Sequence, residues 1–255
     1  AVIASVDIDK DELNKERGLK LKIKINESLS DFFKVFKKKS KGLKIQNPDW
    51  TQKSMLWKKK YPIVLKHYRT QKKFVNPYFF MERLSKYLSK DDVVVADDGA
   101  HLTWAIQSLK VLKQQRLFSA FGNSPMGYAF PAAIGASIAL NKKKIICIDG
   151  DGSIQINIQE LQTLASNKLP IKLIVINNEG YGIIKQFQEL YLQKRHEAVD
   201  SKKGVTNPNF SKVAKAYGIN YSEIKKNSNV DKILKKTIKS KKAEFINVFI
   251  RPDQK

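Results

Sequence analysis

Two polar turns in this sequence carry residue types that bind metal ions. The first is Gly-Asp-Gly at 150–152 and the second is Asn-Asn at 177–178, and each follows an apolar run. In an open parallel sheet, ligands bind where the carboxyl ends of neighbouring strands meet. If the two runs are neighbouring strands, Asp151 and Asn178 bring a carboxylate and an amide oxygen to one place. Asn177 is better explained as an amide that stabilises its turn.

A carboxylate and an amide oxygen are too few to hold a metal ion by themselves. Mg²⁺ prefers oxygen ligands in octahedral geometry and commonly takes several of them from phosphate groups. Gly152 allows a ligand to approach the backbone closely, and the N–H groups of Gly152 and Ser153 lie in a turn toward a helix, which suits an anion. Asp151 could instead be an acid that stabilises the start of that helix. The amide at Asn178 favours the metal site, and this implies a phosphorylated ligand.

The elements that would position these turns alternate regularly from residue 93 onward. The runs predicted as strands are apolar on both faces, and the segments between them have helical periodicity. This pattern predicts an α/β fold, a parallel sheet with helices on both faces. The predicted strands are 93–97, 144–149, 172–177 and 244–250, and the predicted helices are 101–109, 126–140, 157–169, 182–192, 209–218 and 229–240.

The chain before residue 76 has a different character. Residues 1–36 contain two short predicted strands and an amphipathic helix, which is too little to bury a core. We interpret them as the tail of a preceding central α/β domain, so that the chain is part of a longer protein. Residues 37–75 are rich in lysine and predict a linker with one surface helix. Residues 76–255 form the domain that carries the two turns.

The formal net charge of +24 suggests nucleic acid or an anionic membrane as a partner. Only six of the 48 basic residues are Arg, however, and the lysines are scattered in short runs along the chain. We therefore expect no nucleic-acid partner. No apolar run approaches the roughly 20 residues of a membrane helix, so we expect no membrane partner either. The single cysteine, Cys147, lies in an apolar run, which favours a buried thiol in a reducing, cytoplasmic protein.

The two turns also carry a resemblance to a known family. Gly-Asp-Gly, 24 further residues and Asn-Asn resemble the signature of enzymes that bind thiamine diphosphate. Beside the turns stand ELQTL, NKLPIKLIVINN and GYGIIKQFQ, and upstream stand FGNSPMGYAFPAAIGAS and VVVADDGAHLTWA, which are similar to segments of acetolactate synthase-like enzymes. VIASVDID resembles the last strand region of their central domain. The resemblance covers the whole chain, is densest from 75 to 218, and implies the carboxyl-terminal half of such an enzyme, with its thiamine diphosphate-binding fold.

The resemblance implies a role for each position of these motifs. Side-chain oxygens of Asp151 and Asn178 and the backbone carbonyl of Gly180 would hold Mg²⁺, with diphosphate oxygens and a water completing the octahedron. Met126 would bend the cofactor, and Ser124 and Met126 would pair with its pyrimidine ring. The residues implied to bind thiamine diphosphate are Asp98, Gly99, Ala100, His101, Ser124, Met126, Gly150, Asp151, Gly152, Ser153, Asn178, Gly180, Gly182 and Ile183.

Four positions leave other interpretations open. His101 could have a purely structural role at the start of its helix, and Met126 could be core packing. Ala100 stands where the family often has Gln, so a side-chain contact is lost there. Phe187 stands where acetolactate synthases commonly have a Trp that shapes the acceptor site, which makes it a candidate substrate residue and leaves the acceptor open.

The reaction implied by the resemblance is decarboxylation of a 2-keto acid and ligation of the product to a carbonyl acceptor, by a transferase or lyase that needs thiamine diphosphate and Mg²⁺. The family activates the cofactor with a Glu of the amino-terminal domain, usually from the partner subunit of a homodimer or tetramer. No position here matches that Glu, so no catalytic residue is assigned and the segment alone is expected to be inactive. An alternative, from GDGSIQINIQELQT, is a carboligase that adds a two-carbon unit to a keto sugar in surface polysaccharide biosynthesis. Another is a remnant that binds the cofactor without catalysis.

Overall fold

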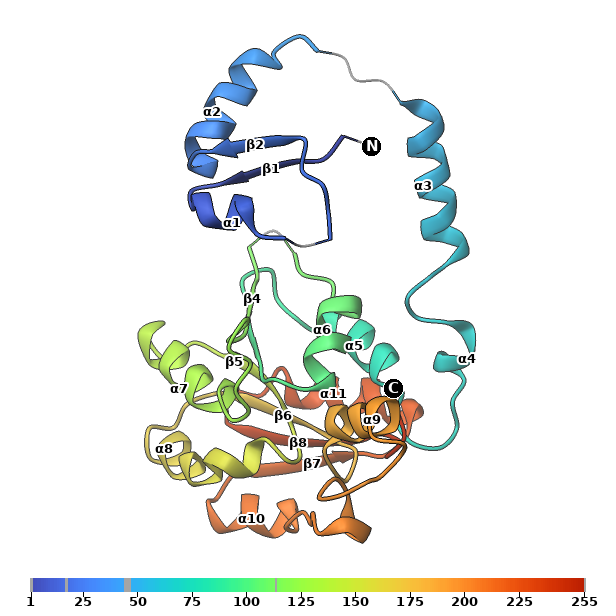
Figure 1. The fold of residues 1–255 in the computed structure, drawn as a ribbon. Helices are drawn as coiled ribbons and strands as arrows, with labels where there is room; N and C mark the ends of the chain where they lie inside the picture. The colour runs from blue at the N-terminus through green and yellow to red at the C-terminus, as the bar shows by residue number, and fades with distance from the viewer. Residues whose placement is uncertain (1, 17, 44–46, 113, 255) are drawn as a thin grey trace. The chain divides into compact units, whose positions relative to one another are not determined.

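The computed structural model describes residues 2–16, 18–43, 47–112 and 114–254 (Figure 1). The chain divides into two compact units, Ala1–Tyr61 and Pro62–Lys255. The division falls inside the segment that the sequence assigns to a linker. Among the helices of the described ranges, none is both long enough and apolar enough to cross a bilayer.

The first unit is built around a pair of parallel strands. Its elements are β1 (Ala4–Asp7), α1 (Lys10–Asn14), β2 (Ile23–Asn26), α2 (Leu29–Lys39) and α3 (Pro48–Lys60). The side chains of Asp9 and Ser28 cap α1 and α2 by accepting backbone N–H groups. Leu13 is the one buried apolar side chain in the described part of this unit. The strands and the surface helix expected here are present, and the assignment of residues 1–36 to a preceding domain stays a prediction.

The second unit contains a six-stranded sheet in which every strand pair is parallel, in the order β4-β3-β5-β6-β8-β7. This confirms the predicted fold class. Its elements are α4 (Lys66–Arg69), α5 (Pro77–Ser85), β3 (Val93–Ala96), α6 (Ala100–Ser108), β4 (Arg116–Phe118), α7 (Ala129–Ala139), β5 (Ile145–Gly150), the 3₁₀ helix η1 (Ile154–Glu160), α8 (Leu161–Ser166), β6 (Lys172–Asn177), α9 (Gly182–Tyr191), the 3₁₀ helix η2 (Ser201–Lys203), α10 (Phe210–Ala216), β7 (Asn220–Ile224), α11 (Asn227–Thr237) and β8 (Glu244–Phe249).

Alternate side chains of the central strands enter two separate cores, one on each face of the sheet. On one face, Ile146 and Ile148 of β5 pack with apolar side chains of α5, α6 and α11. On the other face, Ile145 and Cys147 pack with side chains of α7, α8 and α10. Figure 1 shows these two layers of helices on either side of the strands. The strict alternation of a strand therefore explains why the central runs are apolar throughout.

Several boundaries differ from the predicted ones. Helix α7 begins at Ala129 rather than at Met126, because the preceding residues form a turn. The predicted helix 157–169 is in fact η1 followed by α8. Asn157 breaks the regular helix with φ −125° and donates its side-chain N–H to the carbonyl of Gly127 at 2.5 Å. These departures place Met126 in a turn before α7, next to the Gly127 carbonyl that Asn157 holds.

Candidate functional site

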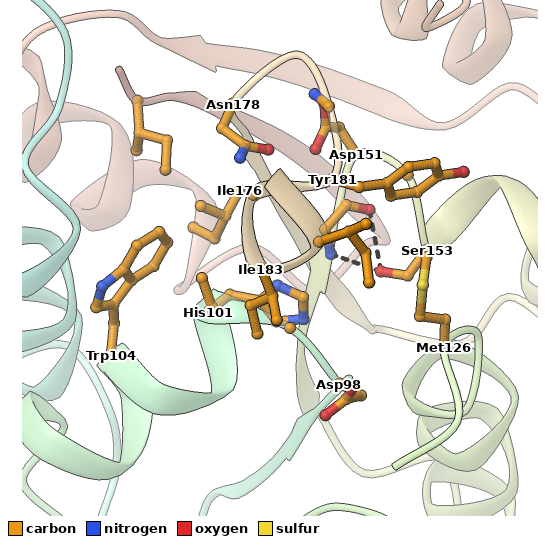
Figure 2. Close-up of a pocket in the computed structure, with 18 residues that line it drawn as sticks. Asp98, His101, Trp104, Met126, Asp151, Ser153, Ile176, Asn178, Tyr181 and Ile183 are labelled. Atoms are coloured by element: carbon orange, nitrogen blue, oxygen red, sulfur yellow. Dashed lines mark hydrogen bonds between the residues drawn. The ribbon is translucent and has the colours of Figure 1, made fainter. Parts of the chain in front are cut away.

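The two polar turns of the sequence lie side by side at the carboxyl ends of neighbouring strands. Strands β5 and β6 are paired in parallel, with Gly150 opposite Ile176. Asp151 and Asn178 follow directly, and Figure 2 shows both side chains over the same edge of the sheet. The condition set by the sequence, that the two strands be neighbours, is met. A pocket opens here, lined by Asp98, Gly99, Ala100, His101, Trp104, Met126, Gly150, Asp151, Gly152, Ser153, Ile176, Asn178, Gly180, Tyr181, Gly182, Ile183, Ile184 and Ile250.

Three oxygen atoms from three residues converge beside this pocket. The side-chain oxygen of Asn178 lies 3.0 Å from Asp151 Oδ1 and 2.8 Å from the carbonyl oxygen of Gly180. In this orientation the amide oxygen faces only acceptors; with the amide turned by 180°, its NH₂ group would donate to both. With a cation between the three oxygens, the amide would be stable in its present orientation and would not have to rotate. Mg–O bonds of 2.0–2.1 Å put adjacent ligands of an octahedron about 2.9 Å apart, close to both separations from the Asn178 oxygen.

The two oxygens of the Asp151 carboxylate face different groups. Its Oδ2 accepts the backbone N–H of Gly180 at 3.0 Å and the side-chain N–H of Asn207 at 2.5 Å, whereas Oδ1 faces Asn178. The residue is 1% exposed, and burial raises the pKa of its carboxyl to about 6 although these hydrogen bonds lower it. A cation at Oδ1 would oppose this rise because it favours the charged form.

Gly180 is a glycine for a steric reason. A Cβ built on it would lie 2.1 Å from the carbonyl oxygen of Val199, which accepts the N–H of Tyr181 at 2.9 Å. The segment around Val199 therefore packs directly on the backbone that presents the third oxygen. Asn177 has the role expected of it, since its Oδ1 accepts the N–H of Glu179 within the turn.

The opposite side of the pocket is suited to an anion. Helix α6 begins at Ala100 without a side-chain cap, so its first N–H groups are available to a ligand. Gly99 precedes it with φ 150°, and a Cβ there would lie 2.5 Å from the ring of His101. His101 is 6% exposed, and its Nε2 has no hydrogen-bond partner among the described residues. Burial lowers the pKa of this imidazole to about 4, so the ring is neutral and has one N–H, and the tautomer with its proton on Nε2 can donate a hydrogen bond to a phosphate oxygen.

A second group of buried acids lies below the pocket and has a different role. Asp97, His101 and Asp149 offer ligand atoms within 4.8 Å of one another. Both oxygens of Asp97, however, accept backbone N–H groups, from Gly127 at 2.9 Å and Ala129 at 2.7 Å. Burial and the charge of Asp97 raise the pKa of the Asp149 carboxyl well above its ordinary value. Asp97 thus holds the turn that carries Met126, and its oxygens are not free for a metal ion.

The structure brings together nearly all of the residues that the sequence singled out. Every position implied to bind the cofactor lines the pocket except Ser124, which is exposed in the turn before α7 with φ 46°. Phe187 does not line the pocket either; it is 52% exposed on α9, and its ring centroid lies 4.8 Å from that of Tyr191.

Other pocket residues were missed by sequence reasoning. Trp104, Ile176, Ile184 and Ile250 belong to apolar runs, and nothing in their pattern separates them from ordinary core positions. Asn207 touches Asp151 from a segment 56 residues further along the chain. Its only signal was an Asn-Pro pair, which is typical of a turn before a helix.

Comparison with known proteins agrees with this geometry. Residues 97–248 match the family model described as thiamine pyrophosphate enzyme, C-terminal TPP binding domain. The chain belongs to the thiamine pyrophosphate enzymes. All the predicted ligand residues in both turns fall within the matched range.

Curated relatives of this thiamine pyrophosphate enzyme include acetolactate synthases. The chain is 33% identical over 241 residues to the acetolactate synthase large subunit of Porphyra purpurea, covering 94% of this chain and 40% of that protein. It is 32% identical over 227 residues to the large subunit from Lactococcus lactis, covering 88% and 37%. It is 32% identical over 221 residues to the mitochondrial acetolactate synthase of Schizosaccharomyces pombe, covering 85% and 32%. The chain thus spans about two fifths or less of these relatives' length.

Proposed function

We propose that this chain holds thiamine diphosphate and Mg²⁺ for an acetolactate synthase-like enzyme, which decarboxylates a 2-keto acid and ligates the product to a carbonyl acceptor. The observation that carries the proposal is the side-chain oxygen of Asn178, which lies 3.0 Å from Asp151 Oδ1 and 2.8 Å from the Gly180 carbonyl oxygen beside a pocket. The pocket has an anion-binding helix start on its other side. A divalent ion bridged to a diphosphate fits this pairing of acceptors and donors.

Different residues of the site would bind the metal ion, the diphosphate and the ring of the cofactor. Asp151, Asn178 and the Gly180 carbonyl would hold Mg²⁺, while the start of α6, His101 and the turn at Gly152 would hold the diphosphate oxygens. When bound, thiamine diphosphate supplies a thiazolium carbon that serves as nucleophile and electron sink. Apolar side chains at the pocket wall, Met126 and Ile183 among them, would exclude water from the ring.

The rest of the enzyme would complete the active site. None of the residues lining the pocket is a glutamate, so we propose that the activating acid comes from another part of an enzyme of the relatives' length, in a partner subunit of a dimer or tetramer. Helix α9 supports a partner beside the pocket, because Ile184, Phe187 and Leu190 are all exposed on it. The buried free thiol of Cys147 supports a reducing, cytoplasmic location.

The acceptor is a separate proposal. Phe187 is exposed on α9, close to the pocket residues Ile183 and Ile184. Phe187 stands in place of the larger Trp that acetolactate synthases commonly have, which leaves more space for an acceptor, and the second candidate function is therefore transfer of a two-carbon unit to a keto sugar. Product analysis with pyruvate plus either a second 2-keto acid or a keto sugar, in an enzyme of full relative length, separates the two.

Binding measurements on the 255-residue chain test the main proposal. Thiamine diphosphate should bind in the presence of Mg²⁺ and bind much more weakly when the metal is chelated, as measured by calorimetry. Asp151→Ala should abolish the metal-dependent part of thiamine diphosphate binding, since the substitution removes an oxygen ligand of the metal ion. Equal binding of the cofactor with and without divalent metal would contradict the proposal.

A further inference from the structure

The segment that follows α9 is fastened to the backbone of the metal site. Val199 accepts the N–H of Tyr181 at 2.9 Å, and Gly180 forms a single antiparallel bridge with Asp200. Lys185 of α9 donates to the Asp200 carboxylate at 3.2 Å. The turn that presents the Gly180 carbonyl is therefore supported from outside by residues far from the two sequence motifs.

The same segment delivers a side chain to the carboxylate of Asp151. Nδ2 of Asn207 donates to Asp151 Oδ2 at 2.5 Å. Oδ1 of Asn207 accepts from Nε2 of Gln155 at 2.9 Å, and this Nε2 also donates to the backbone carbonyl of Asp151 at 3.0 Å. Because Gln155 occupies the oxygen of Asn207, the nitrogen must be the atom that faces the carboxylate. The amide has one orientation.

This contact settles which oxygen of Asp151 is left for a cation. Oδ2 receives two N–H groups, one from Gly180 and one from Asn207, so the carboxylate cannot rotate without losing both. Oδ1 is thereby held toward the side chain of Asn178, 3.0 Å away. Outer hydrogen bonds of this kind orient metal ligands and tune their affinity.

We propose that Asn207 is a positioning residue that fixes the Asp151 carboxylate for the metal ion, with Gln155 fixing Asn207 in turn. The proposal rests on the proposed function, because it takes Asp151 to be a metal ligand. It adds a residue from outside both motifs to the machinery that binds the cofactor.

The effect should appear in metal affinity rather than in folding. Loss of an outer-shell partner typically weakens metal binding by about 10–100-fold. Asn207→Ala should therefore weaken Mn²⁺ and Mg²⁺ binding to the chain with thiamine diphosphate by that factor. Asn207→Asp should lose at least as much at neutral pH, since a second carboxylate replaces the donor. Gln155→Ala should lose less metal affinity than Asn207→Ala. The double variant, with both residues replaced by Ala, should lose little more metal affinity than Asn207→Ala alone, because Gln155 acts through Asn207.

Asn220→Ala is the matched control. Its Nδ2 also donates to a carboxylate, Oε1 of Glu244 at 3.1 Å, but at the amino end of the sheet. The measurements are calorimetric titration of the metal in the presence of thiamine diphosphate, and the melting temperature of each chain without metal. The control should keep wild-type metal affinity.

The outcomes separate the two proposals. If the wild-type chain binds no metal with thiamine diphosphate, the proposed function fails. If the wild type binds and Asn207→Ala binds equally well, only the positioning role is overturned, and the same holds if that variant melts earlier but keeps its metal affinity. Should Asn207→Ala fail to fold, Gln155→Ala carries the test, and wild-type affinity in it overturns the proposal.

Discussion

Replacing Gly180 by Ala should damage the proposed metal site through a steric clash that can be measured in the structure. The added Cβ would lie 2.1 Å from the carbonyl oxygen of Val199, and contacts of a Cβ below 3.0 Å are essentially never seen. The two backbones must therefore separate by about 0.9 Å. Val199 is 1% exposed, so its surroundings are closely packed and leave little space for the backbone to move. Overpacking of this kind costs about 1–3 kcal/mol of stability.

The same shift should change which metal ion binds. A displacement of about 0.9 Å is nearly half of an Mg–O bond of 2.0–2.1 Å, and Mg²⁺ tolerates little departure from octahedral geometry. Ca²⁺ accepts longer, irregular bonds of 2.3–2.6 Å. Gly180→Ala should thus lower the affinity for Mg²⁺ by roughly tenfold or more and lower the affinity for Ca²⁺ by less. The ratio of Mg²⁺ affinity to Ca²⁺ affinity should therefore fall.

The assay is calorimetric titration of each ion with thiamine diphosphate present, together with thermal unfolding without metal. Gly135→Ala is the control, because nothing lies within 4 Å of a Cβ there and the residue is exposed in α7. This control should raise stability by up to about 1 kcal/mol, the difference between Gly and Ala in a helix, and leave ion binding unchanged. An unchanged Mg²⁺ to Ca²⁺ ratio in Gly180→Ala would refute the reasoning.

Three further predictions follow from the described contacts. His101→Ala should weaken thiamine diphosphate binding by about tenfold or more, the usual loss for a hydrogen bond to a charged group, whereas His101→Gln should restore part of it in calorimetry. Lys172 is buried and the pKa of its ammonium is lowered to about 8, below its ordinary value of 10.5. The unfolded chain therefore binds more protons between these values, and stability should rise from pH 8 to 10.5 in the wild type relative to Lys172→Met, as read from urea unfolding. The 255-residue chain alone, loaded with cofactor and Mg²⁺, should not consume pyruvate in a coupled assay, and measurable turnover would show that the activating acid lies within it.

The parts of the fold that the sequence could predict are those whose side chains are buried on both faces. Strands β5 and β6 are apolar throughout because each faces two cores, and this is why their ends and the two polar turns could be located. Strands β4 and β7 were missed because they lie at the edges of the sheet, where partly exposed residues break the apolar run. The start of α7 was misplaced because Met126 and Gly127 continue the apolar pattern, while the Asp97 carboxylate holds the backbone there in a turn.

Contacts between distant segments limit how much of the candidate site could be predicted from the sequence. Asp151 and Asn178 could be paired from sequence since each directly follows a strand, and parallel neighbours end at the same edge. Asn207 follows no strand and reaches Asp151 only because the chain after α9 folds back over Gly180. No local pattern encodes that return, so the residue that we propose to orient the carboxylate is visible only in three dimensions.

The two buried groups of acids show why residue type alone does not identify a metal site. By type, the cluster of Asp97, Asp149 and His101 is the richer set of ligands, with two carboxylates and an imidazole within 4.8 Å. Yet both oxygens of Asp97 accept backbone N–H groups, and burial and the charge of Asp97 raise the pKa of the Asp149 carboxyl. At Asp151, Oδ2 faces donors, whereas Oδ1 faces the side-chain oxygen of Asn178, which also lies 2.8 Å from the carbonyl oxygen of Gly180. The Asn178 amide is satisfied either by turning through 180° to donate to both acceptors or by a cation between the oxygens, and the second arrangement, rather than the count of acidic residues, is the reason why we propose the metal ion for this site.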